Sequence, residues 1–354
     1  MEQSPAALPD QERDWSHLPA DLLVRVFLAL EVPELAASAA VCHGWHAAHR
    51  SDPRLDLSGL FRGPCLVYSS GDCGPGVATL RSLSDGALRR VTLPAAPPFR
   101  ARGVVGSSGG WLVTVGEWAQ LLLVNPATRA QFALPPTRTL KRVARRLTRM
   151  KELLPSCPAV FGRDPLTGRY GPLPPPEPID PEDARLVLYG KVAMSSDDPS
   201  TGSCVVVFVH WPMCEASCRN QLRFVRVGGD TGWRRVIKPH ECDGNDYHDL
   251  FYDDDDRLFY ALRCTGQVDA IDFHGPSSPV VKVIFKKAAN YKFSKKYIVR
   301  APWGDLLQVW IRKTYKMMVF KVDLAEQMVV EVKDLRGHAL FIGLNRSFFV
   351  PVGE

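Results

Sequence analysis

Apolar residues recur at intervals of three or four through the first fifty residues of the chain. This spacing places them on one side of a helix, with Asp21 and Arg25 between them. The apolar positions of the first predicted helix are Leu22, Leu23, Val26, Phe27 and Leu30. Pro33 begins a second predicted helix, and a third runs through Val41, Cys42, Trp45 and Ala48. The pattern predicts a three-helix unit.

The start of this unit has the chemistry of a helix N-terminus. Pro19 suits a first helical turn, where a missing N–H costs nothing. Ser16 offers an oxygen at a plausible cap position, and His17 or Leu18 is the alternative cap. A unit of under forty residues cannot bury enough apolar surface to be stable as a separate domain. We therefore expect it to form half of an interface.

After Arg50 the spacing of apolar residues changes from helical to extended. Short apolar runs alternate with Gly, Pro and Asp turn signals, which is typical of an antiparallel all-β domain. The predicted strands are Cys65–Ser69, Val77–Leu83, Leu88–Leu93, Trp111–Val115, Leu121–Asn125, Arg185–Met194, Cys204–His210, Leu222–Val227, Trp233–Lys238, Arg257–Arg263, Gln267–Phe273, Val280–Phe285, Lys296–Arg300, Asp305–Arg312, Tyr315–Asp323, Met328–Lys333 and Ala339–Leu344. So many short strands exceed one simple sandwich, whereas a β-propeller with four strands per blade accommodates them.

The helical unit resembles the F-box, the motif that docks onto the Skp-type adaptor of cullin ubiquitin ligases. The matching residues are Leu18, Pro19, Leu22, Leu23, Val26, Phe27, Leu30, Leu35, Val41, Cys42 and Trp45. The resemblance implies that these eleven residues form the adaptor-binding set. Helical periodicity alone would not require the Leu-Pro and Val-Cys-x-x-Trp anchors, and a generic helical cap is the alternative. The Ala-rich second helix departs from the family, which more often has long side chains there.

The rest of the chain resembles the kelch-like C-terminal domain of plant F-box proteins known as domain of unknown function 295. The matching segments are 110–113, 122–129, 134–136, 247–260 and the late block that begins KYIVRAPWGDLLQVWIR. The resemblance implies a mainly β fold with a small all-α N-terminal module, an F-box followed by a kelch-like β-propeller. We expect a disordered N-terminus over 1–13, the F-box over 14–52 and the propeller over 60–354.

Two insertions within the predicted propeller have biased composition. The segment 138–151 is a basic amphipathic helix in the prediction, and 172–183 is a Pro-rich acidic loop. The basic side chains are Arg138, Lys141, Arg142, Arg145, Arg146, Arg149 and Lys151. They could form a nuclear-localisation patch, an acidic-partner dock or a nucleic-acid contact, but a solvated helix is favoured because no wider basic and aromatic face accompanies them.

Composition indicates an ordinary folded intracellular protein of nucleus or cytoplasm. The chain has 354 residues, 45% of them hydrophobic and 23% charged, with a net charge of +6. No apolar run approaches a membrane span, and the N-terminus lacks the features of a secretory signal. The nine cysteines are irregularly spaced, which favours reduced thiols over disulfides.

Candidate chemical sites are weak. His210, Cys214, Cys218 and Cys242 could be assembled into a zinc site on paper, but a single Cys-x-x-x-Cys favours free thiols. The acidic run 253–256 lacks the alternation and final Glu of a calcium loop, so we expect a charged hairpin tip. His240, His248 and Asp249 lie near Cys242 in sequence, yet no catalytic motif is present, and we expect neither a catalytic residue, a metal nor a cofactor.

The resemblance implies a non-catalytic substrate receptor of a Skp–cullin–F-box ubiquitin ligase. Its partners would be the adaptor, through it a cullin, and a protein target held by the β domain. The chain would act by proximity, holding a target lysine near a charged ubiquitin carrier. The alternatives are a propeller enzyme of glycosidase type and a nuclear scaffold that binds nucleic acid through Arg142, Arg145 and Arg146.

Overall fold

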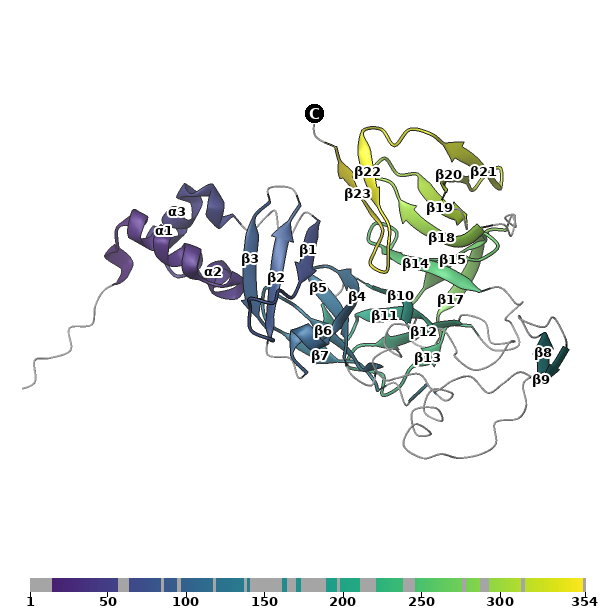
Figure 1. Cartoon of the computed structure of the whole chain (residues 1–354), viewed down its shortest axis with the longest axis horizontal. Coiled ribbons are helices and arrows are strands. Elements are labelled where there is room, and N and C mark those ends of the chain that lie inside the picture. Colours follow the sequence, from purple (N-terminus) through teal and green to yellow (C-terminus); the bar gives the residue numbers. More distant parts are fainter. Residues whose placement is uncertain are drawn as a thin grey trace, which may run out of the picture. The chain divides into compact units, whose positions relative to one another are not determined.

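The fold is that of a computed structural model, which describes residues 15–56, 64–83, 86–93, 97–116, 119–136, 139–140, 161–163, 170–172, 189–195, 198–210, 221–237, 246–275, 278–286, 293–312 and 316–352. The chain divides into two compact units. The first comprises Met1–Leu93 and Pro126–Thr128, and the second comprises Pro94–Asn125 and Arg129–Glu354. Figure 1 shows the helices in purple and the strands of both units from blue to yellow.

Three α-helices open the first unit, as the spacing of apolar residues predicts. They are α1 (Ala20–Ala29), α2 (Val32–Ser38) and α3 (His43–Ser51), flanked by the 3₁₀ turns η1 (Trp15–His17) and η2 (Pro53–Leu55). The predicted caps Ser16, His17 and Leu18 are wrong, because Pro19 itself occupies the N-cap position of α1 without a side-chain hydrogen bond. The N-cap of α3 is Cys42, whose Sγ accepts from the N–H of Trp45 at 3.5 Å.

The first unit also contains a three-stranded antiparallel sheet in the order β1-β2-β3. Its strands are β1 (Cys65–Tyr68), β2 (Val77–Ser82) and β3 (Leu88–Thr92). Helix α2 contacts β3, and the carboxylate of Glu31 at the N-cap of α2 accepts two hydrogen bonds from Thr92. The Arg89 guanidinium donates to the carbonyl of Arg54. The helices and this sheet therefore share one folded body.

The second unit is built from four-stranded antiparallel sheets whose strands follow chain order. The first sheet consists of β4 (Gly103–Ser108), β5 (Trp111–Val115), β6 (Leu121–Val124) and β7 (Gln131–Ala133). The second consists of β10 (Tyr189–Met194), β11 (Val205–His210), β12 (Gln221–Arg226) and β13 (Arg234–Arg235). The third consists of β14 (Tyr247–Asp253), β15 (Leu258–Arg263), β16 (Val268–Asp272) and β17 (Val280–Phe285). The fourth consists of β18 (Phe293–Arg300), β19 (Leu306–Arg312), β20 (Met317–Asp323) and β21 (Met328–Val332). Two hairpins complete the described strands, β8 (Phe161–Arg163) with β9 (Tyr170–Pro172), and β22 (His338–Phe341) with β23 (Phe348–Pro351).

The first strands of successive sheets lie side by side, β4 against β10, β10 against β14 and β14 against β18. This is the arrangement of propeller blades around an axis, and it buries an apolar layer between each pair of blades. The layer between the first two blades of the unit includes Val113, Leu123, Val206 and Phe208. The fold class is therefore mainly β with a small helical module, as predicted.

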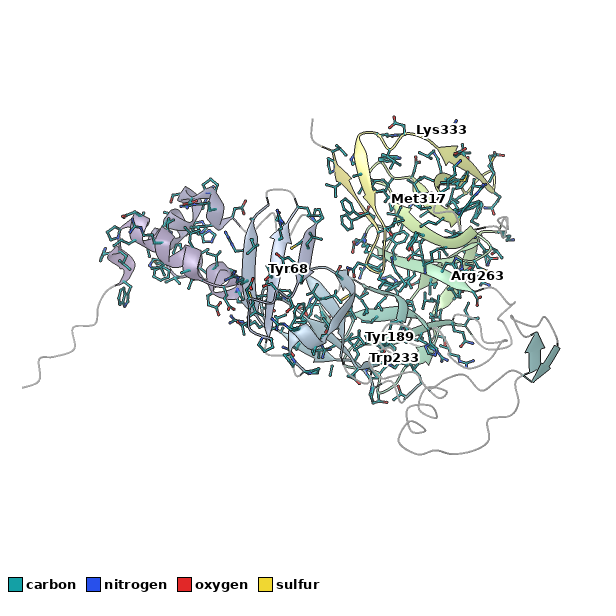
Figure 2. All side chains as sticks on the ribbon, in the orientation of Figure 1. Tyr68, Tyr189, Trp233, Arg263, Met317 and Lys333 are labelled. Atoms are coloured by element: carbon teal, nitrogen blue, oxygen red, sulfur yellow. The ribbon has the colours of Figure 1, made fainter. Side chains whose placement is uncertain are left out.

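Aromatic rings fill the layer between these two blades. The Phe208 ring lies edge-on to Tyr189 at 5.0 Å and to Trp233 at 4.7 Å between ring centroids. Tyr189 and Trp233 are labelled in Figure 2. The buried polar ends of both partners have acceptors, since Tyr189 Oη donates to the Ala119 carbonyl and Trp233 Nε1 to the Pro135 carbonyl. Such satisfied aromatic pairs stabilise a core beyond the area that they bury.

All seventeen predicted strands overlap strands of the structure, although only Arg234–Arg235 of the predicted Trp233–Lys238 forms a strand and residues 185–188 of the predicted Arg185–Met194 lie outside the described residues. Among the described residues, six further strands were not predicted: β4, β7, β8, β9, β14 and β23. Strand β4 carries two glycines and two serines, which give it a weak local preference for a strand, and its pairing with β5 overrides that preference. Strand β14 has the sequence YHDLFYD, and the acidic run 253–256 at its end predicts a turn there.

Candidate functional site

The helical module separates its apolar residues into a core and an exposed face. Leu23 and Phe27 of α1 are buried with Leu35 of α2. The Phe27 ring packs at 5.3 Å from the Trp45 ring and at 6.0 Å from the His49 ring, between centroids. The module thus closes its own core through these contacts.

The exposed side of α1 is apolar. Leu22 and Val26 stand four residues apart and are 41% and 46% exposed. Pro19, which is also exposed, lies three residues before Leu22. At 3.6 residues per turn these three side chains share one side of the helix. We call this set, Pro19, Leu22 and Val26, the α1 apolar face. Apolar groups that face water in such a row are typical of an interaction surface.

The eleven residues of the predicted adaptor-binding set fall into three groups. Leu23, Phe27 and Leu35 are buried; Leu18, Leu30, Cys42 and Trp45 are partly buried; Pro19, Leu22, Val26 and Val41 are exposed. The buried members shape the module from within, and the exposed members are available to another molecule. The structure adds Trp15, which the sequence reasoning missed although it lies only three residues before Leu18. Its side chain is 58% exposed, and its carbonyl accepts from Trp45 Nε1 at 3.2 Å.

A shallow cavity of about 560 Å³ lies on another side of α1, between that helix and the end of α3. It is lined by Ala20, Asp21, Val24, Arg25, Leu28, Ser51, Asp52 and Arg54. Asp52 and Arg54 are paired at 2.6 Å, and hydrogen bonds from Arg54 lower the pKa of Asp52 to about 2. The mixed polar lining distinguishes this cavity from the α1 apolar face.

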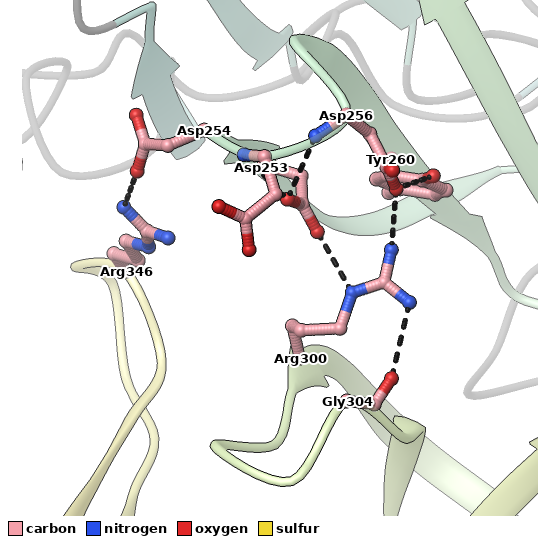
Figure 3. A network of polar contacts seen from close by, with 8 residues as sticks. Asp253, Asp254, Asp256, Tyr260, Arg300, Gly304 and Arg346 are labelled. Carbon is pink, nitrogen blue, oxygen red and sulfur yellow. Dashed lines mark hydrogen bonds and ion pairs between the residues drawn. The ribbon is translucent and has the colours of Figure 1, made fainter.

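The acidic run 253–256 forms the tip of the β14–β15 hairpin, as predicted, and two arginines pair with three of its four carboxylates (Figure 3). Arg300 of β18 donates to Asp253 at 2.8 Å and to Asp256 at 2.7 Å, while Tyr260 donates to Asp256. Arg346 pairs with Asp254 at 3.1 Å. Burial, followed by Asp256, raises the pKa of Tyr260 to about 12. This network ties three segments of the propeller together.

The described part of the chain holds no group of three or more His, Cys, Asp or Glu residues that could bind a metal ion. Of the four residues that were considered as a candidate zinc site, His210 is buried on β11, whereas Cys214, Cys218 and Cys242 lie outside the described residues. His240 also lies outside them, while Asp249 is paired with Lys191. Within the described ranges, no disulfide joins Cys42, Cys65, Cys73, Cys204 or Cys264.

Most of the two predicted insertions also lies outside the described residues. The structure describes only Thr139 and Leu140 of the basic segment 138–151, and only Pro172 of the Pro-rich segment 172–183. All seven basic side chains of the candidate patch, Arg138, Lys141, Arg142, Arg145, Arg146, Arg149 and Lys151, fall outside this range. The patch therefore stays a prediction. No helix in the described part of the chain is long and apolar enough to cross a membrane.

The geometry defines a two-part protein, a helical F-box module followed by a β-propeller. A family model described as F-box-like matches residues 15–55, and one described as KIB1-4 beta-propeller matches residues 80–354. The chain belongs to the KIB1-4 beta-propeller family, because that match covers most of its length. The predicted membership of a plant F-box family with a propeller is confirmed. No curated protein matches the sequence.

Solved structures resemble the chain only distantly. Hsv2 of Kluyvelomyces marxianus has 10% identity over 77% of this chain and 70% of its own, with a TM-score of 0.32. The Malassezia sympodialis allergen Mala s 1 has 11% identity over 82% and 86%, with a TM-score of 0.36. KlAtg21, in complex with the coiled-coil of AgAtg16, has 8% identity over 81% of each chain and a TM-score of 0.38. At these identities and TM-scores the resemblances carry no argument about function.

Proposed function

We propose that this protein is the substrate-receptor subunit of a Skp–cullin–F-box ubiquitin ligase. F-box modules generally bind Skp-type adaptors, and proteins that combine an F-box with a propeller are typically non-catalytic ligase subunits. The α1 apolar face is the observation that carries the proposal. The core of the module is already closed around the fully buried Phe27, so the exposed Leu22 and Val26 are not needed to fill it. Their exposure to water is typical of a surface that binds another molecule.

In this role the F-box spans about residues 14–52, and α1 presents Pro19, Leu22 and Val26 to the adaptor. The partly buried Leu18 and Trp45 are further candidate contacts with the adaptor, while the buried Leu23 and Phe27 hold α1 in place within the module. The propeller over 60–354 binds the target protein. The chain contributes positioning, because holding a target lysine near the charged ubiquitin carrier raises their effective concentration.

The test measures the affinity of the full chain for a Skp-type adaptor. Leu22→Ala together with Val26→Ala should weaken binding by about 30- to 1000-fold, the usual effect of removing central interface anchors. Val330→Ala is the matched control, since Val330 is also an exposed apolar residue, 47% accessible, but belongs to β21 of the propeller. Unchanged adaptor binding by the Leu22/Val26 double variant would remove this interface assignment.

A further inference from the structure

Three successive blades of the propeller carry the same irregularity near the start of their first strand. The pairing register of β10 with β11 shifts just before Lys191, that of β14 with β15 just before Asp249, and that of β18 with β19 just before Lys295. The residues that pair with these three are the penultimate residues of the second strands: Val209, Leu262 and Ile311. Lys191, Asp249 and Lys295 therefore occupy equivalent positions in adjacent blades. We call them the inner-strand charge set. Bulges of this kind redirect side chains and are frequent beside functional sites.

Two members of the inner-strand charge set neutralise each other. Lys191 Nζ lies 2.9 Å from Asp249 Oδ1, and the two side chains are 2% and 1% exposed. The Lys191 ammonium also donates to the carbonyls of Gly343, at 2.9 Å, and Asn345, at 2.5 Å, so its three protons all have acceptors. Lys191 is therefore fully satisfied.

Asp249 is satisfied as well. Its Oδ2 accepts from the N–H of Ile298 at 2.8 Å, and its Oδ1 accepts from the N–H of Leu250 at 2.9 Å. With Lys191 on one side and two backbone donors on the other, this carboxylate has little capacity left for another cation.

Lys295 is the third member, and its charge is not neutralised among the described residues. It makes no hydrogen bond or ion pair there, and its Nζ lies 5.7 Å from the centre of the Tyr297 ring. The Nζ of Lys191 lies 5.8 Å from that same ring. Burial lowers the pKa of Lys295, Lys191 lowers it further, and Asp249 opposes both. A partly buried ammonium without a partner is costly, so proteins rarely keep one without a use.

His248, the bulge residue between Tyr247 and Asp249, carries a polar nitrogen that is not used in a hydrogen bond among the described residues. Its Nδ1 is buried and has no hydrogen-bond partner in the described part of the chain. Burial, with repulsion from Lys296 and Lys295, lowers the pKa of His248 to about 4, so the ring is neutral at pH 7. A neutral imidazole can present either a donor or an acceptor at this nitrogen. Lys295, which has no ion pair in the described part of the chain, and the unpartnered Nδ1 of His248 therefore belong to side chains that influence each other electrostatically.

We propose that Lys295, supported by His248, binds a single oxyanion group, a carboxylate or a phosphate, at the inner strands of the propeller. The bound group supplies the negative charge that the inner-strand charge set lacks, and Lys295 donates to it as Lys191 donates to Asp249. The site is separate from the α1 apolar face and does not depend on adaptor binding.

The test is equilibrium dialysis of the full chain with radiolabelled inorganic phosphate and, in a second arm, with radiolabelled acetate, at constant ionic strength. One saturable site is expected for at least one of the two anions, and the arm that binds identifies the oxyanion class. Lys295→Gln should weaken binding by about tenfold or more, as loss of a hydrogen bond to a charged group typically does. Lys295→Arg keeps the charge and should retain the site.

Lys282→Gln is the matched control, because Lys282 lies exposed on the outer strand β17, and it should bind like the parent chain. Without added anion, Lys295→Gln should melt no lower than the parent, since it removes a partly buried charge that has no ion pair in the described part of the chain. The proposal is overturned if neither anion saturates a site, if Lys295→Gln binds as well as the parent, or if that variant melts lower, which would give Lys295 a structural role.

Discussion

Glu31 accepts hydrogen bonds from both the backbone N–H and the hydroxyl of Thr92, at 2.7 and 2.6 Å. Glu31 stands at the N-cap of α2 and Thr92 ends β3, so this contact joins the helical module to the first sheet over sixty-one residues of sequence. The two hydrogen bonds help to fix how the F-box helices stand on the sheet that follows them.

Removing this contact should weaken the first unit. Thr92→Val removes the hydroxyl donor, and Glu31→Ala removes both acceptors, so each should lower the free energy of unfolding by about 1 kcal/mol. Because both variants break one interaction, the double variant should cost less than the sum, with a coupling of about 0.5 kcal/mol or more. Urea unfolding of the two single variants and the double variant measures this. Strictly additive effects would mean that the contact contributes nothing.

Phe27 and Val26 are neighbours with opposite roles. Phe27→Ala empties the centre of the helical module, where the side chain is 0% exposed, and should destabilise the first unit by about 3–5 kcal/mol. Val26→Ala changes an exposed residue and should alter stability by no more than about 0.5 kcal/mol. Circular dichroism during urea titration compares the two. Equal losses would show that the exposed face of α1 is covered in solution by the chain itself.

Asp249 compensates a buried cation, so its neutralisation should be costly. Asp249→Asn leaves Lys191 without its counter-ion and should lower the free energy of unfolding by about 3–5 kcal/mol. Asp254→Asn is the control, since Asp254 pairs with Arg346 at the surface and should cost at most about 1 kcal/mol. Denaturant midpoints at pH 7 provide the comparison, and similar losses for the two variants would contradict the burial argument.

His248 should make the fold sensitive to mild acid. Its pKa is about 4 in the folded chain, mainly because of burial, and near 6.5 when unfolded. Between these values the unfolded chain binds more protons, so stability is intact above about pH 6.5 and falls as the pH drops towards 4. The loss attributable to this residue is at most about 3 kcal/mol.

The pH dependence is tested by comparing unfolding of the parent chain, His248→Gln and His274→Gln at several pH values. His248→Gln should flatten the curve between pH 6.5 and 4. His274 lies exposed beside Asp272, and its replacement should leave the His248 contribution in place. A slope that survives in His248→Gln would assign the acid sensitivity to other groups.

The sequence determined the local elements wherever the side-chain pattern had one clear period. The helices around Phe27 and Pro33 follow from apolar spacing and a proline start, and strands such as β11 and β19 follow from unbroken apolar runs. The Leu-Pro and Trp45 anchors also sufficed to indicate the F-box, which the family match confirms.

Only the tertiary structure decided which of these residues face water and which charges meet. Leu22 and Leu23 read alike in the sequence, yet one is exposed and the other buried, because the packing of α1 on its neighbours selects a side of the helix. Likewise the sequence of β14 does not show which charge Asp249 meets, and a one-residue bulge in that strand sets Asp249 against Lys191 from another blade. Periodicity fixes how a segment folds locally, but partners distant in the chain fix what each side chain contacts.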